Sequence, residues 1–138
     1  MIALVAGLAV IVAVVVAGGI ALNVYDQQTK IDRSTPTVVV TQLVYEMFSN
    51  RDDEAVARFS CRKAELGPLR ELLSGIKAQE ASGGPNVKVT AEALTLSGKS
   101  EVHAQLRLSA PTGDGIENWI FDTADQDGWR VCAARKVT

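Results

Sequence analysis

The chain begins with a long apolar segment, which constrains its architecture more than any other stretch. Residues 1–23 of the 138-residue sequence contain neither a charged side chain nor a proline. A helix needs about 20 apolar residues to cross the hydrocarbon core of a bilayer. We therefore predict a transmembrane anchor helix at residues 1–24, a juxtamembrane connector at 25–35 and a separate domain at 36–138.

The same segment is a poor match to a cleaved signal peptide. Such signals have a basic start, an apolar core of about 7 to 15 residues and a small-residue cleavage site. Here no lysine or arginine precedes the apolar run, and the run is longer. An uncleaved, single-pass anchor is the better interpretation.

Small side chains recur at every fourth position of the anchor, at Ala9, Ala13, Ala17 and Ala21. Residues four apart share one face of a helix, and small residues let a second helix approach closely within lipid. We therefore predict that this face packs against a transmembrane helix of a larger complex. The alternative is that alanine is simply common in such helices and that lipid surrounds this one.

Charge and cysteine content narrow the class of protein. The formal net charge is −2 and no cluster of basic residues is present, which disfavours nucleic acid as a partner. Cys61 and Cys132, with a single histidine, are too few for a zinc site. They form either a disulfide or two buried thiols. A bridge across about 70 residues would stabilise the fold by about 4 kcal/mol and belongs in an oxidising compartment.

Two arguments about orientation conflict. Lys30 and Arg33 follow the apolar run, and a count of basic residues places the domain in the cytoplasm. Long domains translocate largely regardless of charge, and the cysteine pair favours an oxidising compartment. We give the cysteines more weight and predict an extracytoplasmic domain on the plasma membrane.

The domain divides into a helical half and a strand half. Thr35-Pro36 is typical of a helix start, and apolar spacing predicts helices at 36–50, 52–61 and 69–79. Alternating apolar residues then predict four antiparallel strands in a meander, with a bulge near Ala93 and a tight turn at Asp127-Gly128. The expected fold class is α+β, with three helices on a four-stranded antiparallel sheet.

The last two strands are apolar on both faces, so one face would remain after the helices are packed. Trp119, Phe121, Trp129 and Val131 are the candidate interface residues. A contiguous exposed apolar patch is unusual on a monomer. A second copy of the chain, as a homodimer, or a different subunit would cover it.

No group of residues in the sequence has the spacing of a catalytic or metal site. His103 lies on the polar face of its strand, and a lone histidine there is more often solvated than catalytic. Asp122, Asp125 and Asp127 are out of step with a calcium loop, and the acids at 52–54 suit a helix start. We therefore predict no catalytic residue, no metal, no cofactor and no enzymatic activity.

The order of elements and the ending Asp127-Gly128-Trp129-Arg130-Val131-Cys132 carry a resemblance. Over residues 37–136 the chain resembles the small cone-shaped domains of the nuclear transport factor 2-like superfamily, particularly membrane-anchored ones of mycobacteria and related actinobacteria. The resemblance implies a curved sheet and a Cys61–Cys132 disulfide joining a short helix to the last strand. The acid and histidine pattern of the superfamily's enzymes is not matched.

Two functions from different classes follow. The first is a non-enzymatic accessory subunit of a membrane complex. The resemblance suggests the actinobacterial cytochrome bcc-aa3 respiratory supercomplex, ahead of a lipid transporter. The second is a membrane-tethered module that binds a small molecule or lipid between helices and sheet.

Overall fold

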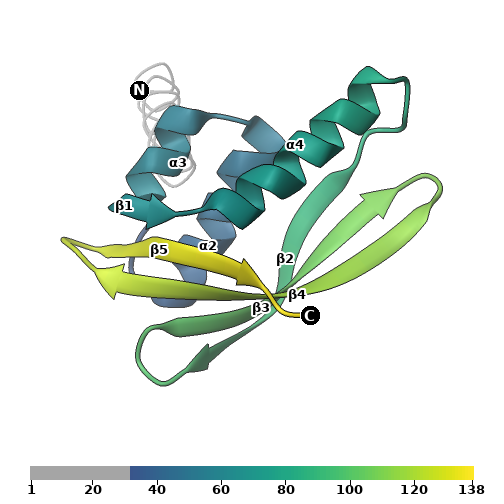
Figure 1. Ribbon diagram of the computed structural model, residues 1–138. Coiled ribbons are helices and arrows are strands. Elements are labelled where there is room, and N and C mark those ends of the chain that lie inside the picture. Colours follow the sequence, from purple (N-terminus) through teal and green to yellow (C-terminus); the bar gives the residue numbers. More distant parts are fainter. Residues whose placement is uncertain (1–31) are drawn as a thin grey trace, which may run out of the picture. The chain divides into compact units, whose positions relative to one another are not determined.

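The computed structural model describes residues 32–138, which form one compact unit. The expected anchor at 1–24, its alanine stripe at Ala9, Ala13, Ala17 and Ala21, and most of the connector lie outside these residues. The described elements, in chain order (Figure 1), are α2 (Pro36–Tyr45), η1 (Glu46–Asn50), α3 (Asp53–Phe59), β1 (Ser60–Glu65), α4 (Gly67–Ala81), β2 (Lys88–Ser97), β3 (Glu101–Ala110), β4 (Gly113–Asp125) and β5 (Trp129–Lys136).

The sheet has five strands, so the predicted four-stranded antiparallel sheet is wrong. The strand order is β1-β5-β4-β3-β2, and β1 pairs in parallel with β5, with Ser60 opposite Val131 and Glu65 opposite Ala133. The four later strands form the expected antiparallel meander. The segment 60–65, SCRKAE, has little apolar alternation, and its strand conformation depends on a partner almost 70 residues away.

The predicted fold class also included a transmembrane helix at residues 1–24, which lie outside the described residues. Within residues 32–138, no helix combines the length and the apolar character needed to cross a membrane. The described fold is therefore an α+β domain with three α-helices and a five-stranded mixed sheet.

Two helix starts follow the chemistry expected from the sequence. The Thr35 hydroxyl accepts a hydrogen bond from the Val38 backbone N–H at 3.2 Å, and Pro36 occupies the first turn of α2. A carboxylate oxygen of Asp52 accepts from the N–H groups of Glu54 and Ala55 at the start of α3. Both caps satisfy backbone donors that have no partner within the helix. These two predictions are confirmed.

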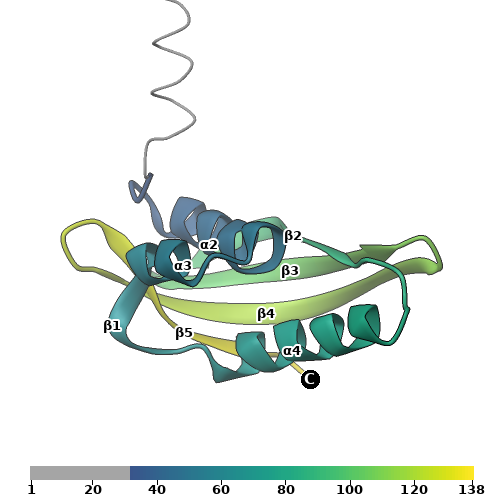
Figure 2. The same cartoon turned by 90° about the horizontal axis from the view of Figure 1, so that it is seen from above.

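The helices cover one face of the sheet, which we call the inner face (Figures 1 and 2). α2 contacts β2 and β5, and α4 contacts β5. Side chains from helices and strands interlock there. The core residues that are least exposed, at 0%, are Val39, Val40, Leu43, Leu69, Val102, Leu106, Phe121 and Val131.

Two local irregularities of the sheet and its turns lie where the sequence predicts them. Between β2 and β3 the pairing passes from Glu92–Gln105 to Thr95–His103 with an interruption, and Ala93 adopts φ +50°. That interruption is the expected bulge. Asp127 and Gly128 both have positive φ in the turn from β4 to β5, which confirms the predicted tight turn.

Candidate functional site

The opposite, outer face of the sheet carries a row of polar side chains. On β3, Val102, Ala104 and Leu106 are buried, so the alternate residues Glu101 and His103 point away from the helices. The register sets Glu101 opposite Asp122 and His103 opposite Ile120 of β4. Polar and apolar residues from neighbouring strands are thereby brought side by side.

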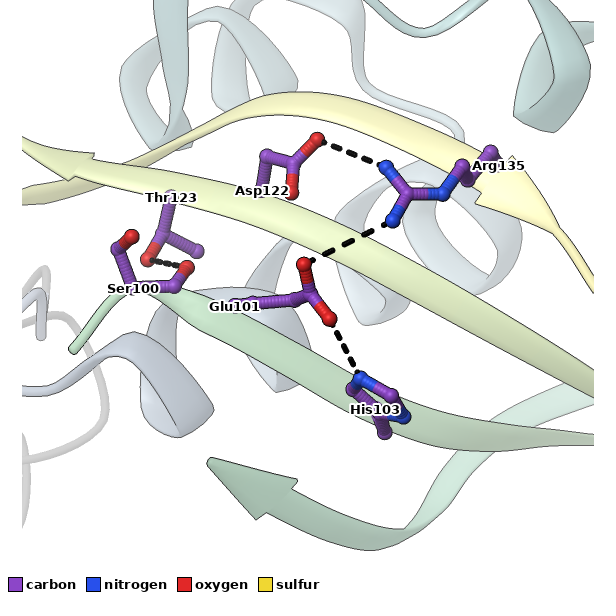
Figure 3. Close-up of polar contacts among 6 residues, drawn as sticks. All are labelled: Ser100, Glu101, His103, Asp122, Thr123 and Arg135. Carbon is purple, nitrogen blue, oxygen red and sulfur yellow. Dashed lines mark hydrogen bonds and ion pairs between the residues drawn. The ribbon is translucent and has the colours of Figure 1, made fainter. Parts of the chain in front are cut away.

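Four of these side chains form a connected network (Figure 3). The Glu101 carboxylate lies 2.7 Å from His103 Nε2 and 3.6 Å from Arg135 Nη2. Arg135 Nη1 in turn donates to Asp122 Oδ2 at 3.2 Å. The side chains are 37–55% exposed. The network is therefore open to solvent and each pair is weak by itself.

A second group of charges on the same face is centred on Arg107. Its Nε lies 3.0 Å from both carboxylate oxygens of Glu92, and its Nη1 is 3.6 Å from Asp114. The hydrogen bond to Glu92 raises the pKa of the Arg107 guanidinium further above its already high ordinary value. Paired charges of this kind fix orientation at an interface more than they add affinity.

Within residues 32–138, the His103 ring is hydrogen-bonded to the Glu101 carboxylate and to no hydroxyl or thiol. The hydroxyl of Thr123, a buried residue, donates to the Ser100 backbone carbonyl at 2.6 Å (Figure 3). This hydrogen bond links β4 to the residue that precedes β3, and the hydroxyl is not directed at His103. Within residues 32–138, no three His, Cys, Asp or Glu side chains gather as metal ligands.

Apolar side chains lie beside the charges on the outer face. Ile116 is 51% exposed and Val137 is 43% exposed, while Ile120 is half-buried. A hollow of about 390 Å³ is lined by His103, Gln105, Asn118, Ile120 and Val137, among others. We call the Glu101–His103–Asp122–Arg135 network together with these apolar residues the outer-face site.

The residues predicted as an interface lie elsewhere. Trp119, Phe121 and Val131 are 2%, 0% and 0% exposed and form part of the core, and Trp129 is half-buried against it. The helices of the same domain therefore cover them. Periodicity showed that β4 is apolar on both faces but could not decide which face meets the helices.

The disulfide between Cys61 and Cys132 is present, which confirms the pairing implied by the resemblance. It joins two neighbouring strands, β1 and β5, whereas the sequence placed Cys61 in a helix. Asp122 pairs with Arg135, and Asp125 accepts from the Gly128 N–H at 3.1 Å. Asp122 therefore forms an ion pair across the sheet, and Asp125 stabilises the turn.

One feature of the surface was not predicted from the sequence. A hollow of about 680 Å³ lies at the start of β1, and its lining includes Cys61, Arg62, Gln126 and Arg130. No local motif marks it, because its residues come from segments almost 70 positions apart.

No family model matches this chain, and neither a curated protein nor a solved structure is similar to it.

Proposed function

We propose that this chain is a non-enzymatic accessory subunit of a larger membrane protein complex. The apolar segment at 1–23 attaches it to the plasma membrane as a single-pass protein, with the domain on the extracytoplasmic side. The domain docks on a partner protein through the outer-face site. The observation that carries this proposal is the exposed ion-pair network with apolar residues beside it.

The composition of the outer-face site suits protein docking. Apolar side chains such as Ile116 and Val137 provide area that gains from losing water. The network of Glu101, Arg135 and Asp122 supplies directional charges that discriminate between partners. A surface of this mixed character is typical of a non-obligate interface.

The alternative function, binding of a small molecule or lipid within the domain, has less support. It requires space between the helices and the sheet. Side chains such as Leu43, Leu69, Leu106 and Phe121 fill that region and are fully buried there. A ligand would have to displace a close-packed core, which is costly. We therefore favour the subunit.

The partner's identity rests on the resemblance, which suggests the cytochrome bcc-aa3 supercomplex as the first complex to test. The full chain, tagged after Thr138, is purified from native membranes in mild detergent. We expect a stoichiometric partner with the wild-type chain. Recovery of the chain alone, as a monomer or a homodimer, would contradict the proposal.

A pair of double variants tests the surface itself. Ile116→Glu with Arg135→Glu alters the outer-face site, and we expect at least a tenfold drop in recovered partner. The matched control is Tyr45→Glu with Arg70→Glu, which makes the same change in net charge on the helices. Tyr45 is 53% exposed, and so is the Arg70 side chain. Equal recovery with both double variants would show that docking does not use the outer face.

A further inference from the structure

Three arginines from distant parts of the sequence lie together at one end of the domain. Arg33 and Arg130 both donate to the Arg58 backbone carbonyl, from Nη1 at 3.4 Å and 3.1 Å. The Arg33 carbonyl accepts from the Trp129 N–H at 3.0 Å. Arg62 and Arg130 line the 680 Å³ hollow at the start of β1. We call Arg33, Arg62 and Arg130 the arginine cluster.

The carboxylates of residues 32–138 do not neutralise the charge of the arginine cluster. Within residues 32–138, none of its three members lies in ion-pair distance of an Asp or Glu, whereas Arg51, Arg70, Arg107 and Arg135 all do. Contacts to backbone carbonyls orient Arg33 and Arg130 without cancelling their charge. The remaining N–H groups of the three guanidinium forks suit a phosphate, which they bind in a bidentate manner.

The acidic residues next to the arginine cluster are compatible with phosphate binding. Asp125 and Asp127 lie in the turn next to Arg130, and Asp125 is engaged by the Gly128 N–H. The chain as a whole carries a net charge of −2, so general attraction to an anionic surface is not expected. Affinity for an anion must come from a local concentration of positive charge, such as this one.

The disulfide holds the hollow in shape. Cys61 precedes Arg62 on β1, and Cys132 lies two residues after Arg130 on β5. The covalent link therefore holds together the two strands whose arginines line this hollow. Without it, β1 is attached to the sheet by a short parallel pairing with an irregular register.

Arg33 lies close in the sequence to the apolar segment that we propose as the membrane anchor. Residues 24–32 separate it from the apolar segment, and an extended chain gains at most about 3.6 Å per residue. If that segment lies in the bilayer, the arginine cluster is confined to within roughly 35 Å of it along the chain. Anionic headgroups are the phosphates available at that distance.

We propose that the arginine cluster binds the phosphate of an anionic phospholipid headgroup and holds this end of the domain at the membrane surface. This inference rests on the membrane attachment in the proposed function. It adds a second, lipid-specific contact, which is separate from the outer-face site.

The test uses the full chain in neutral detergent micelles, titrated with phosphatidylglycerol or phosphatidylcholine and observed by native mass spectrometry. We expect at least tenfold tighter retention of phosphatidylglycerol by the wild-type chain. Arg62→Gln with Arg130→Gln should bind both lipids equally. The control, Arg70→Gln with Lys77→Gln on α4, removes the same charge elsewhere and should keep the preference.

A single variant controls for the possibility that the double variant loses lipid preference because it misfolds. Arg62 is exposed, and its side chain makes no hydrogen bond within residues 32–138. The variant Arg62→Gln should therefore fold normally and lower the preference at least threefold. No preference in the wild-type chain, or an unchanged preference in the double variant, would overturn the proposal. Complete displacement of the lipid by 10 equivalents of inorganic phosphate would overturn it in favour of a free-anion site.

The test of lipid binding can fail or succeed independently of the test of partner docking. Lipid preference is measured on the isolated chain and needs no partner, whereas partner recovery is measured with the outer-face variants. Extraction of the chain from membranes by alkaline carbonate would contradict membrane attachment, whatever the micelle titration shows.

Discussion

The two faces of β4 illustrate how one strand serves two purposes. Trp119 and Phe121 point to the helices and are almost completely buried, with their ring centroids 6.4 Å apart. Ile116 and Ile120, on the other face, lie among the charges of β3 and β5. Both sets are apolar in the sequence. Their roles differ because the larger side chains fill the core and the smaller ones remain at the surface.

The comparison predicts very different costs for truncating adjacent residues. Phe121→Ala should lower the free energy of unfolding by about 3–5 kcal/mol, because it leaves a cavity in a packed core. Ile120→Ala, next to it on the outer face, should cost about 1 kcal/mol or less. Chemical denaturation of the detergent-solubilised chain, followed by tryptophan fluorescence, measures both. Similar losses would show that the outer face is also packed against something.

The next largest effect concerns the edge of the sheet. Replacing Cys61 and Cys132 together by serine should lower the free energy of unfolding by about 2–4 kcal/mol, since the bridge closes a long loop in the unfolded chain. Dithiothreitol should destabilise the wild-type chain by a similar amount and leave the double variant unchanged. A double variant as stable as the oxidised wild-type chain would show that β1 is held by its other contacts.

The smallest effect is expected at a polar contact outside both faces. Arg51, after η1, makes a bidentate ion pair with Glu80 of α4 at 2.8 and 2.9 Å. The Arg51 hydrogen bond lowers the pKa of Glu80 below its ordinary value near 4.5. The charged pair therefore stabilises the fold above that pH, and its contribution is lost as the pH falls through the lowered pKa.

Glu80→Gln tests this dependence on pH. We expect the variant to be less stable than the wild-type chain at pH 7, and the difference to shrink below about pH 4.5 as the wild-type carboxyl becomes protonated. Glu71→Gln, at an exposed position of the same helix, controls for the loss of one negative charge. A difference that persists unchanged at pH 3 would contradict the ion-pair explanation.

Much of the fold could be predicted because its signals are local. The Thr35 and Asp52 caps, the turn at Asp127-Gly128 and the bulge at Ala93 each depend on a few neighbouring residues. The candidate site was predicted less well. His103 was placed correctly on a polar face, but its network with Glu101 and Arg135 depends on strand register and could not be read from spacing.

The helix and strand periods, the caps and the turns could be predicted from the sequence, because these follow from hydrogen bonds and side-chain spacing within one segment. Two features required the folded structure: residues 60–65 form a parallel edge strand, and one particular face of β4 is buried. The folded structure also brought Arg33, Arg62 and Arg130 together. These three features depend on which distant segments meet and on the side-chain volumes that fit between them. No single stretch of the sequence contains that information.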